Sequence, residues 1–210
     1  MLIYENNEKV EEYDKFIKVG FPLTSKITEL TGITDEMLEN EGVSEETVAQ
    51  DLKEKLIPGT VMIAHNAQFD LSFIYYLLVR HFPFDVESIV SNLDWIDTLT
   101  VLKDRKDYPH TLKDSVEFYE LEDVNYHRAI DDTKALYEVV QAMKEKRNDL
   151  KGYLNLFGCN PKYPVDEKYR FSFIEYLKQP YHYDYNFSPD NPIPEFKTLA
   201  AKRKSLRSNR

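Results

Sequence analysis

The stretch that most constrains the fold is VMIAHNAQFDLSFI, residues 61–74. A short apolar run, 61–64, stops at His65 and Asn66, and apolar residues then return three and four positions apart. The first half has the pattern of a buried strand, and the second half has that of a helix with one apolar face. A strand that leads directly into a helix predicts an α/β layered fold.

The same alternation of strands and helices runs through residues 1–147. Further strands are predicted at 2–4, 13–19 and 93–96, and further helices from Ser44 and at 98–104, 111–119 and 128–147. Residues 20–43 are predicted to be irregular, apart from a short helical turn capped by Thr34. The first two strands are expected to form an antiparallel pair on an otherwise parallel sheet.

The composition changes after residue 150. Residues 153–187 contain seven tyrosines and four phenylalanines, and six prolines lie between 161 and 194. We interpret 148–195 as a loop-rich aromatic extension packed on the core, with packing favoured over the stacking of nucleic-acid bases. Residues 196–210 hold six basic residues and no acidic one, which is typical of a disordered, solvated tail. Contact between this tail and nucleic acid or a partner is the less favoured interpretation.

Charge and cysteine usage point to a cytoplasmic protein. The formal net charge is −10, so the molecule as a whole does not attract phosphate. Cys159 is the single cysteine, which excludes an internal disulfide and suits a reducing compartment. The sequence contains no apolar run of membrane-spanning length and no signal-peptide pattern, so no membrane partner is expected.

Two aspartates fall on the apolar faces of predicted helices. Asp70 and Asp132 share these faces with apolar residues at helical spacing: Phe73, Ile74 and Leu77 for the first, and Ala129, Leu136, Val139 and Met143 for the second. A carboxylate that points toward a core is costly unless a cap, a basic partner or backbone amides satisfy it. Two such carboxylates, the second with His127 five residues before it, favour another explanation, a site for two divalent ions.

Hard carboxylate oxygens suit Mg²⁺ or Mn²⁺, and two such ions form a clamp for phosphoryl displacement. His127 would then act as general base, because the pKa of histidine lies near neutral pH.

Several motifs resemble those of the DEDDh 3′–5′ exonucleases, which include the proofreading epsilon-type subunits of bacterial DNA polymerase III. Residues 65–70, HNAQFD, resemble the second family motif, and 127–132, HRAIDD, resemble the third. Shorter matches follow the same order, at 30–34, LTGIT, and 96–99, IDTL. The resemblance covers residues 1–147 and implies a ribonuclease H-like mixed sheet flanked by helices. It also implies that Asp70 and Asp132 bind metal, that His127 activates water, and that Asn66 and His65 lie near the substrate.

The family's first motif, an Asp-x-Glu on the central strand, has no match in a suitable position. The Asp-x-Glu at 85–87 follows the helix that carries Asp70 and does not lie in a predicted central strand. Residues 1–4 resemble the family's second strand instead, so the resemblance implies an N-terminally truncated domain that lacks two metal ligands. Strand edges and apolar side chains should then be uncovered. An internal start in a longer enzyme is favoured over a degenerate gene product or a non-catalytic module.

The sequence thus predicts a metal-dependent 3′–5′ exonuclease that releases nucleoside monophosphates from single-stranded ends of DNA, or of RNA. Proofreading or repair beside a DNA polymerase is the implied role, and the activity of these 210 residues alone is expected to be impaired. The alternative is a catalytically inactive module that binds nucleic acid or a polymerase through the aromatic extension and the basic tail.

Overall fold

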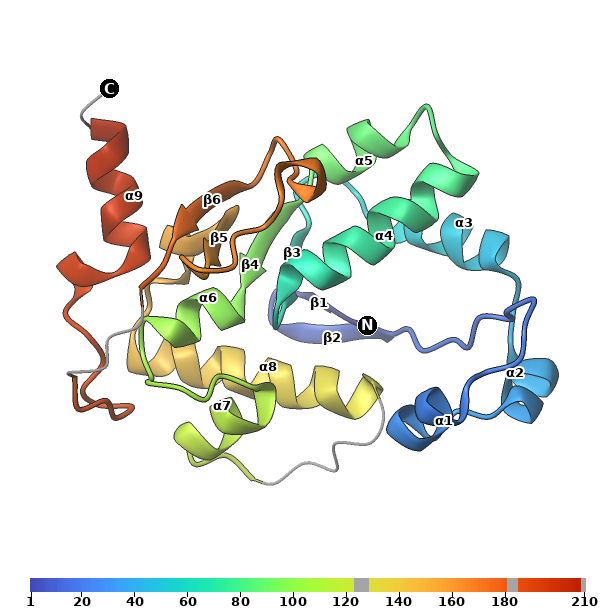
Figure 1. Ribbon diagram of the computed structural model, residues 1–210, viewed down its shortest axis with the longest axis horizontal. Helices are drawn as coiled ribbons and strands as arrows, with labels where there is room; N and C mark the ends of the chain where they lie inside the picture. Colours follow the sequence, from blue (N-terminus) through green and yellow to red (C-terminus); the bar gives the residue numbers. More distant parts are fainter. Residues whose placement is uncertain (123–128, 181–184, 209–210) are drawn as a thin grey trace.

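The centre of the computed structural model, which describes residues 1–122, 129–180 and 185–208, is a parallel sheet of four strands (Figure 1). The strands lie in the order β3 (Val61–Ala64), β4 (Asp94–Asp97), β5 (Leu156–Cys159) and β6 (Glu175–Lys178). Ile96 at the middle of β4 pairs with Ile63 on one side and with Leu156 on the other. The carboxyl ends of β3 and β4 therefore meet at one edge of the sheet.

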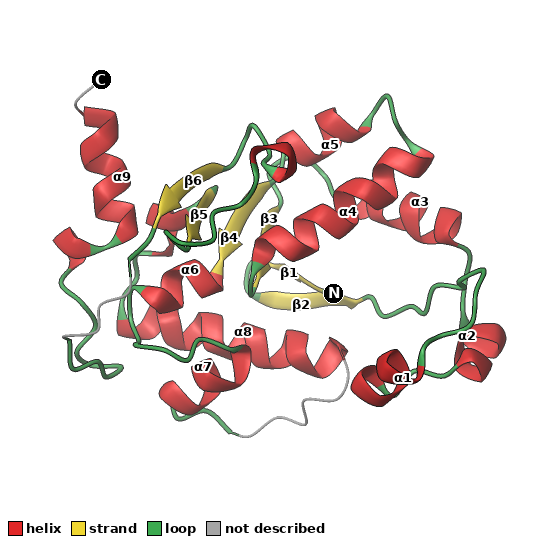
Figure 2. Ribbon diagram, viewed as in Figure 1, coloured by secondary structure: helices red, strands yellow, loops and turns green. Residues whose placement is uncertain are grey.

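Helices cover both faces of this sheet (Figure 2). One layer consists of α3 (Glu45–Lys55), α4 (Ala67–His81) and α5 (Val86–Ser91), and the other of α6 (Thr98–Lys103), α7 (Leu112–Phe118) and α8 (Ala129–Lys146). Side chains alternate between the two cores, since Trp95 and Phe157 face the first layer while Ile96 and Leu156 face the second. The predicted α/β ribonuclease H-like architecture is confirmed.

The N-terminal hairpin corrects one strand prediction. The hairpin pairs β1 (Leu2–Glu5) with β2 (Glu8–Glu12), whereas the sequence pattern placed the second strand at 13–19. Asn6 and Asn7 both have positive φ, 51° and 69°, which makes a two-residue turn and starts the return strand at once. The hairpin forms a separate two-stranded sheet, so the expected single mixed sheet is divided in two.

Residues 20–43 are more regular than expected. Thr34 caps α2 (Asp35–Glu41) by accepting a hydrogen bond from the Met37 amide, as predicted. A further helix, α1 (Ser25–Thr31), was not predicted. It begins at a Thr24 cap and ends at Gly32, whose φ of 70° suits glycine. A helix of two turns carries too few apolar residues to show a clear period.

The outer edge of β3 has no strand partner among the described residues. Val61 and Ile63 on this strand are 44% and 37% exposed, although both are β-branched and well suited to a buried strand. The hairpin nevertheless lies between the same two helical layers, because Met1 packs against the first core and Tyr4 stacks on Tyr137 of α8 at 4.1 Å. The exposure of apolar side chains expected beside an unpaired strand edge is therefore observed at β3.

The aromatic extension contributes half of the four-stranded sheet. Both β5 and β6 lie within 148–195, and β5 hydrogen-bonds in parallel to β4 of the core. The extension also includes the 3₁₀ turns η1 (Leu150–Tyr153) and η2 (Glu167–Tyr169), and a third, η3 (Glu195–Lys197), joins it to the basic tail. The folded core therefore does not end at residue 147, because the strands of the extension belong to the same sheet.

The basic tail forms a helix, which corrects the prediction of disorder. Helix α9 (Leu199–Ser208) buries Leu199 against the second core. Arg203 is also buried, and its guanidinium donates to the carbonyl oxygens of Gly152 and Leu154. Asp104 accepts a hydrogen bond from the Leu199 amide at 2.6 Å, at the first turn of the helix. The tail is ordered because one arginine satisfies carbonyl groups of η1 and one leucine fills a core position.

The long C-terminal helix of the matched core follows its prediction closely, since α8 spans Ala129–Lys146 against an expected 128–147. The buried Arg105 donates to the carbonyl oxygens of Met143 and Arg147 and pairs with Asp149, so it satisfies the end of this helix. The Asp-x-Glu at 85–87 lies at the start of α5, outside any strand, as predicted. None of the helices in the described ranges has the length and apolar character needed to cross a bilayer.

Candidate active site

The turn between β3 and α4 brings the second motif to the carboxyl edge of the sheet. Asn66 takes the left-handed conformation, with φ 72° and ψ 51°, which lets the chain turn sharply from strand to helix. The backbone amides of Asn66 and Ala67 both donate to one carboxylate oxygen of Asp97, at 2.9 and 3.1 Å. The first turn of α4 is thereby tied to the end of the neighbouring strand.

Asp97 is the most heavily bonded carboxylate at this edge. It is 5% exposed, and it also accepts hydrogen bonds from the amides of Leu99 and Thr100 at 3.2 Å and from the Thr100 hydroxyl at 2.6 Å. The Thr100 hydroxyl in turn accepts from the Gly158 amide of β5 at 2.8 Å. Five donors compensate the burial of this charge, and the network joins β3, β4, β5 and two helix starts.

Asp70 lies in the first turn of α4 at an exposed position, and Phe73 on the same face is 66% exposed, so the predicted core-facing placement of this aspartate is wrong. The buried face of the helix carries Ala67, Leu71 and Leu78 instead. Partial loss of water around the carboxyl group raises the pKa of Asp70, and the negative charge of Asp97 raises it further. A carboxylate that is poorly hydrated and close to a second negative charge gains from a bound cation. The electrostatics of Asp70 therefore suit a hard metal ion.

Asp132 lies in the first turn of α8 and is half-buried, while Val139 and Met143 farther along its face are buried. Helix α8 thus carries the predicted apolar stripe, and the side chains of this stripe are more exposed near Asp132 than near Met143. Asp131 on the flanking face lies 3.7 Å from the Lys134 ammonium group. His127, the predicted general base, falls outside the described residues.

The metal-binding prediction receives partial chemical support. Asp70 and Asp132 offer the oxygen ligands that Mg²⁺ and Mn²⁺ prefer. Within the described ranges, however, no three His, Cys, Asp or Glu side chains gather closely enough to hold a metal ion. Asp70 and Asp132 therefore stay predicted ligands, and the described residues do not by themselves form a complete two-metal site.

His65 uses both ring nitrogens in contacts within the protein. Nδ1 lies 3.1 Å from the Thr98 hydroxyl, and Nε2 lies 2.8 Å from the His110 carbonyl oxygen. Burial lowers the pKa of His65, so its neutral form dominates near pH 7. Because a carbonyl only accepts, the proton of the neutral ring resides on Nε2. The Thr98 hydroxyl lies 3.1 Å from Nδ1 and also donates to the Ala64 carbonyl oxygen at 3.1 Å. The imidazole therefore holds the strand end against the 104–111 loop, and its predicted substrate contact stays a prediction.

The lowered pKa of His65 predicts a pH-dependent contribution to stability. The pKa of His65 lies below about 6.5 in the folded protein and at about 6.5 in the unfolded chain, so between these two pH values the unfolded chain binds more protons. The contribution of neutral His65 to stability is therefore complete above about pH 6.5 and is lost as the pH falls toward the folded pKa. His65→Gln removes the titration and should cost about 1 kcal/mol at pH 7.5 through weakened hydrogen bonds. Urea unfolding at pH 7.5 and 5.5 should show the difference between the two proteins shrinking at the lower pH. An equal difference at both values would contradict a neutral His65.

The motif comparison singled out the IDTL segment but assigned no role to Asp97. The signal was present, because an aspartate directly after a strand and before a helix is a typical N-cap. Asp97 also accepts hydrogen bonds from the start of α4, the helix that follows β3. This second role requires β3 and β4 to be neighbours in the sheet, which spacing along the chain does not reveal. Gln68 and Tyr169, joined across the pocket described below, were missed for the same reason.

Comparison with known proteins agrees with this geometry. The sequence model of the RNase_T exonuclease family matches residues 2–140. This chain belongs to the exonuclease family. Its match includes the β3–α4 turn, the Asp97 network and the first turn of α8, and it ends before the two strands of the extension.

Similar curated proteins are PolC-type DNA polymerases III. The chain is 33% identical over 150 residues to that of Caldanaerobacter subterraneus, which covers 70% of this chain and 10% of the polymerase. It is 33% identical over 150 residues to that of Thermotoga maritima, with 67% and 10% covered. The chain thus spans about a tenth of the length of these relatives.

Solved structures with a similar fold include Escherichia coli exonuclease I. A zinc-bound complex of that enzyme with single-stranded DNA has a TM-score of 0.59 at 18% identity, over 70% of this chain and 35% of the other. A complex with a dA16 oligonucleotide has a TM-score of 0.58 at 18% identity, over 70% and 36% of the two chains. At this level of identity the likeness concerns the fold.

Proposed function

We propose that this exonuclease-family chain serves in the 3′–5′ removal of nucleoside monophosphates from single-stranded DNA. The observation that carries the proposal is the placement of Asp70 at the carboxyl edge of the sheet. The start of its helix donates two backbone-amide hydrogen bonds to the buried Asp97. Open α/β sheets bind their ligands at this edge. The family membership and the single-stranded DNA bound to the similar exonuclease I support the substrate class.

In the proposed site, Asp70 and Asp132 would each ligate a divalent ion, Mg²⁺ or Mn²⁺. Such ions would supply a nucleophilic water and stabilise the leaving oxygen. His127 would accept a proton from the attacking water, and Asn66, exposed at the turn, would contact the nucleotide. Asp97 would act as a positioning residue, because its bonds fix the helix that presents Asp70.

We further propose that the remaining metal ligands come from a segment that pairs with the free edge of β3. Support comes from the exposed Val61 and Ile63 and from the hairpin that already lies between the same helical layers. Intact mass and the N-terminal peptide of the protein from its native cells provide the test. Added sequence with an Asp-x-Glu in an apolar strand would support the proposal, and a protein that begins at Met1 and acts alone would overturn it.

Digestion of an oligonucleotide labelled at its 5′ end tests the function itself. With Mg²⁺ or Mn²⁺, the labelled strand should shorten one nucleotide at a time and release monophosphates, because attack from the 3′ end keeps the label on the shrinking product. Chelation by EDTA should stop the reaction, and His127→Ala or Asp132→Ala should slow it at least about 100-fold. Full activity in the Asp132→Ala protein would contradict the assignment.

A binding module without catalysis is the second candidate, and the absence of a third metal ligand among the described residues favours it. Such a module should bind single-stranded DNA in the presence of EDTA, weaken as salt rises, and release no nucleotide. Partnership with a DNA polymerase is proposed on the PolC-type relatives alone, and co-purification from native cells tests it. A cytoplasmic location is proposed on the buried, unpaired thiol of Cys159.

A further inference from the structure

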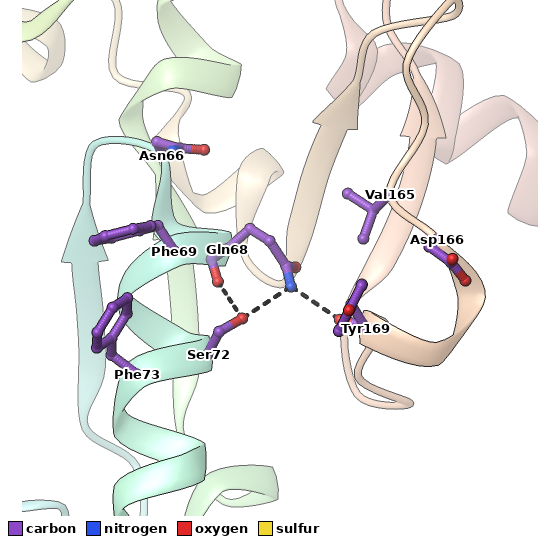
Figure 3. Close-up of a pocket in the computed structure, with 8 residues that line it drawn as sticks. All are labelled: Asn66, Gln68, Phe69, Ser72, Phe73, Val165, Asp166 and Tyr169. Carbon is purple, nitrogen blue, oxygen red and sulfur yellow. Dashed lines mark hydrogen bonds between the residues drawn. The ribbon is translucent and has the colours of Figure 1, made fainter.

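A pocket of about 330 Å³ lies beside the proposed site, between helix α4 and the extension (Figure 3). The first two turns of α4 form one wall with Gln68, Phe69 and Phe73. The segment around η2 forms the other wall with Val165 and Tyr169, about 100 residues farther along the chain. The pocket therefore joins the second exonuclease motif to a part of the chain that lies outside the family match at 2–140.

The side chain of Gln68 holds the two walls together. Its Nε2 donates to the Tyr169 carbonyl oxygen at 2.9 Å and to the Ser72 hydroxyl at 3.2 Å, and its Oε1 accepts from the Tyr176 hydroxyl at 2.7 Å. Figure 3 shows the bonds from Nε2 bridging helix and extension. Gln68 is two residues from Asp70, so the extension is fixed directly onto the helix turn that carries the proposed metal ligand.

Aromatic rings on both walls remain exposed. Phe69 and Phe73 are 60% and 66% exposed, with ring centroids 4.6 Å apart, and Tyr169 is 50% exposed on the opposite wall. Large apolar groups gathered on a surface indicate a binding site more often than isolated ones do. Exposed aromatic rings on both walls of an open pocket offer stacking surfaces to another flat ring, such as an unpaired nucleobase.

Positive charges flank the η2 wall. The Lys168 ammonium group lies 4.8 Å from the centre of the Tyr169 ring, and Lys162 and Arg170 are exposed on the same segment. Asp166 also lines the pocket, but it lies 3.5 Å from the Lys168 ammonium group, so its charge is already compensated. Lys162 and Arg170 can therefore contact the phosphates on either side of a stacked base despite the negative charge of the whole chain.

We propose that the pocket between α4 and η2 binds an unpaired base of single-stranded DNA, and that the extension thereby forms part of the substrate path. The inference rests on the proposed function for the position of the strand, because the 3′ end would lie at Asp70, one helical turn from Phe73. Tyr169 stacks on the base, Phe73 contacts the strand from the helix wall, and Lys162 and Arg170 neutralise adjacent phosphates.

Fluorescence of 2-aminopurine, placed singly at successive positions from the 3′ end of an oligonucleotide, tests the proposal in EDTA, where no cleavage occurs. Stacking should quench the probe at one or two positions only. Tyr169→Ala and Phe73→Ala should each weaken binding about 10-fold and relieve that quenching. Tyr169→Trp should retain both. Adding the protein should not change the fluorescence of the same oligonucleotide in a duplex, where the probe is already stacked between its neighbours.

Two matched variants serve as controls. Tyr163 is 79% exposed on the same extension and Phe84 is 98% exposed beyond the end of α4, and neither lines the pocket. Tyr163→Ala and Phe84→Ala should bind as the wild type does. Equal losses in pocket and control variants, or no loss in either, would overturn the inference. Position-dependent quenching without nucleotide release in Mg²⁺, both measured on the protein as it occurs in its native cells, would overturn the proposed function and leave the pocket assignment standing.

Discussion

Asp70→Asn is expected to lower nuclease activity by about 10³-fold while leaving the protein at least as stable as the wild type. Activity falls because a neutral amide replaces the proposed charged metal ligand. Stability is retained because poor hydration and the nearby Asp97 already disfavour the ionised carboxylate in the folded state, as its raised pKa indicates. Steady-state digestion and thermal unfolding, measured on the protein as it occurs in its native cells, provide the two readouts.

Asp85→Asn is the matched control for this variant. Asp85 belongs to the chain's Asp-x-Glu, but it is exposed, precedes α5, and pairs with Lys53 at 2.6 Å. Its removal should leave digestion unchanged and alter the free energy of unfolding by no more than about 1 kcal/mol. If Asp85→Asn abolished digestion and Asp70→Asn did not, the assignment of Asp70 as a metal ligand would be wrong.

Asp97→Ala is expected to destabilise the fold by about 3 to 5 kcal/mol, which corresponds to a fall of about 10 °C in the unfolding temperature. The substitution leaves four backbone amides and the Thr100 hydroxyl without their acceptor at a buried position. Two of those amides begin α4, so the placement of Asp70 should be lost as well. Denaturant unfolding checks the stability, and digestion by the folded fraction checks the placement.

Asp97→Asn and Asp94→Ala separate placement from general instability. Asn retains the shape of Asp97 but loses its charge and one acceptor oxygen, so an intermediate loss of stability and activity is expected. Asp94 begins the same strand and accepts one bond from the Asn155 side chain at 2.7 Å, so its replacement should cost about 1 kcal/mol and spare digestion. Full digestion by folded Asp97→Asn protein at wild-type stability would refute the positioning role.

Local sequence patterns were sufficient to predict a helix or strand wherever its apolar residues had a clear period or its ends had a clear boundary. The apolar run before His65 and the apolar stripe of residues 129–146 yielded β3, α4 and α8 almost at their observed bounds. The second hairpin strand was misplaced because EKVEE, 8–12, is largely exposed and has no alternating apolar pattern, while the Asn-Asn turn before it set the register.

The extension and the tail show where local patterns fail. Seven tyrosines and several prolines indicated loops, yet two four-residue strands from this region complete the sheet, because β4 offered them an edge to pair with. The composition of the tail predicted a solvated segment. Instead it forms a packed helix, in which Arg203 is buried and donates to the carbonyl oxygens of residues 152 and 154. Both outcomes depend on surfaces supplied by distant residues.

The sequence by itself determined the layered fold and the family motifs, and it yielded Asp70, Asp132 and His127 as the predicted chemical groups, since these follow from residue type and spacing along one strand or helix. Tertiary structure decided that Asp97 anchors the start of α4, that His65 lies between the start of α6 and the 104–111 loop, and that Gln68 bonds to Tyr169 across a pocket. Each of these contacts joins segments at least 30 residues apart. Pairing between strands and docking between layers bring such residues together, and no local period encodes either.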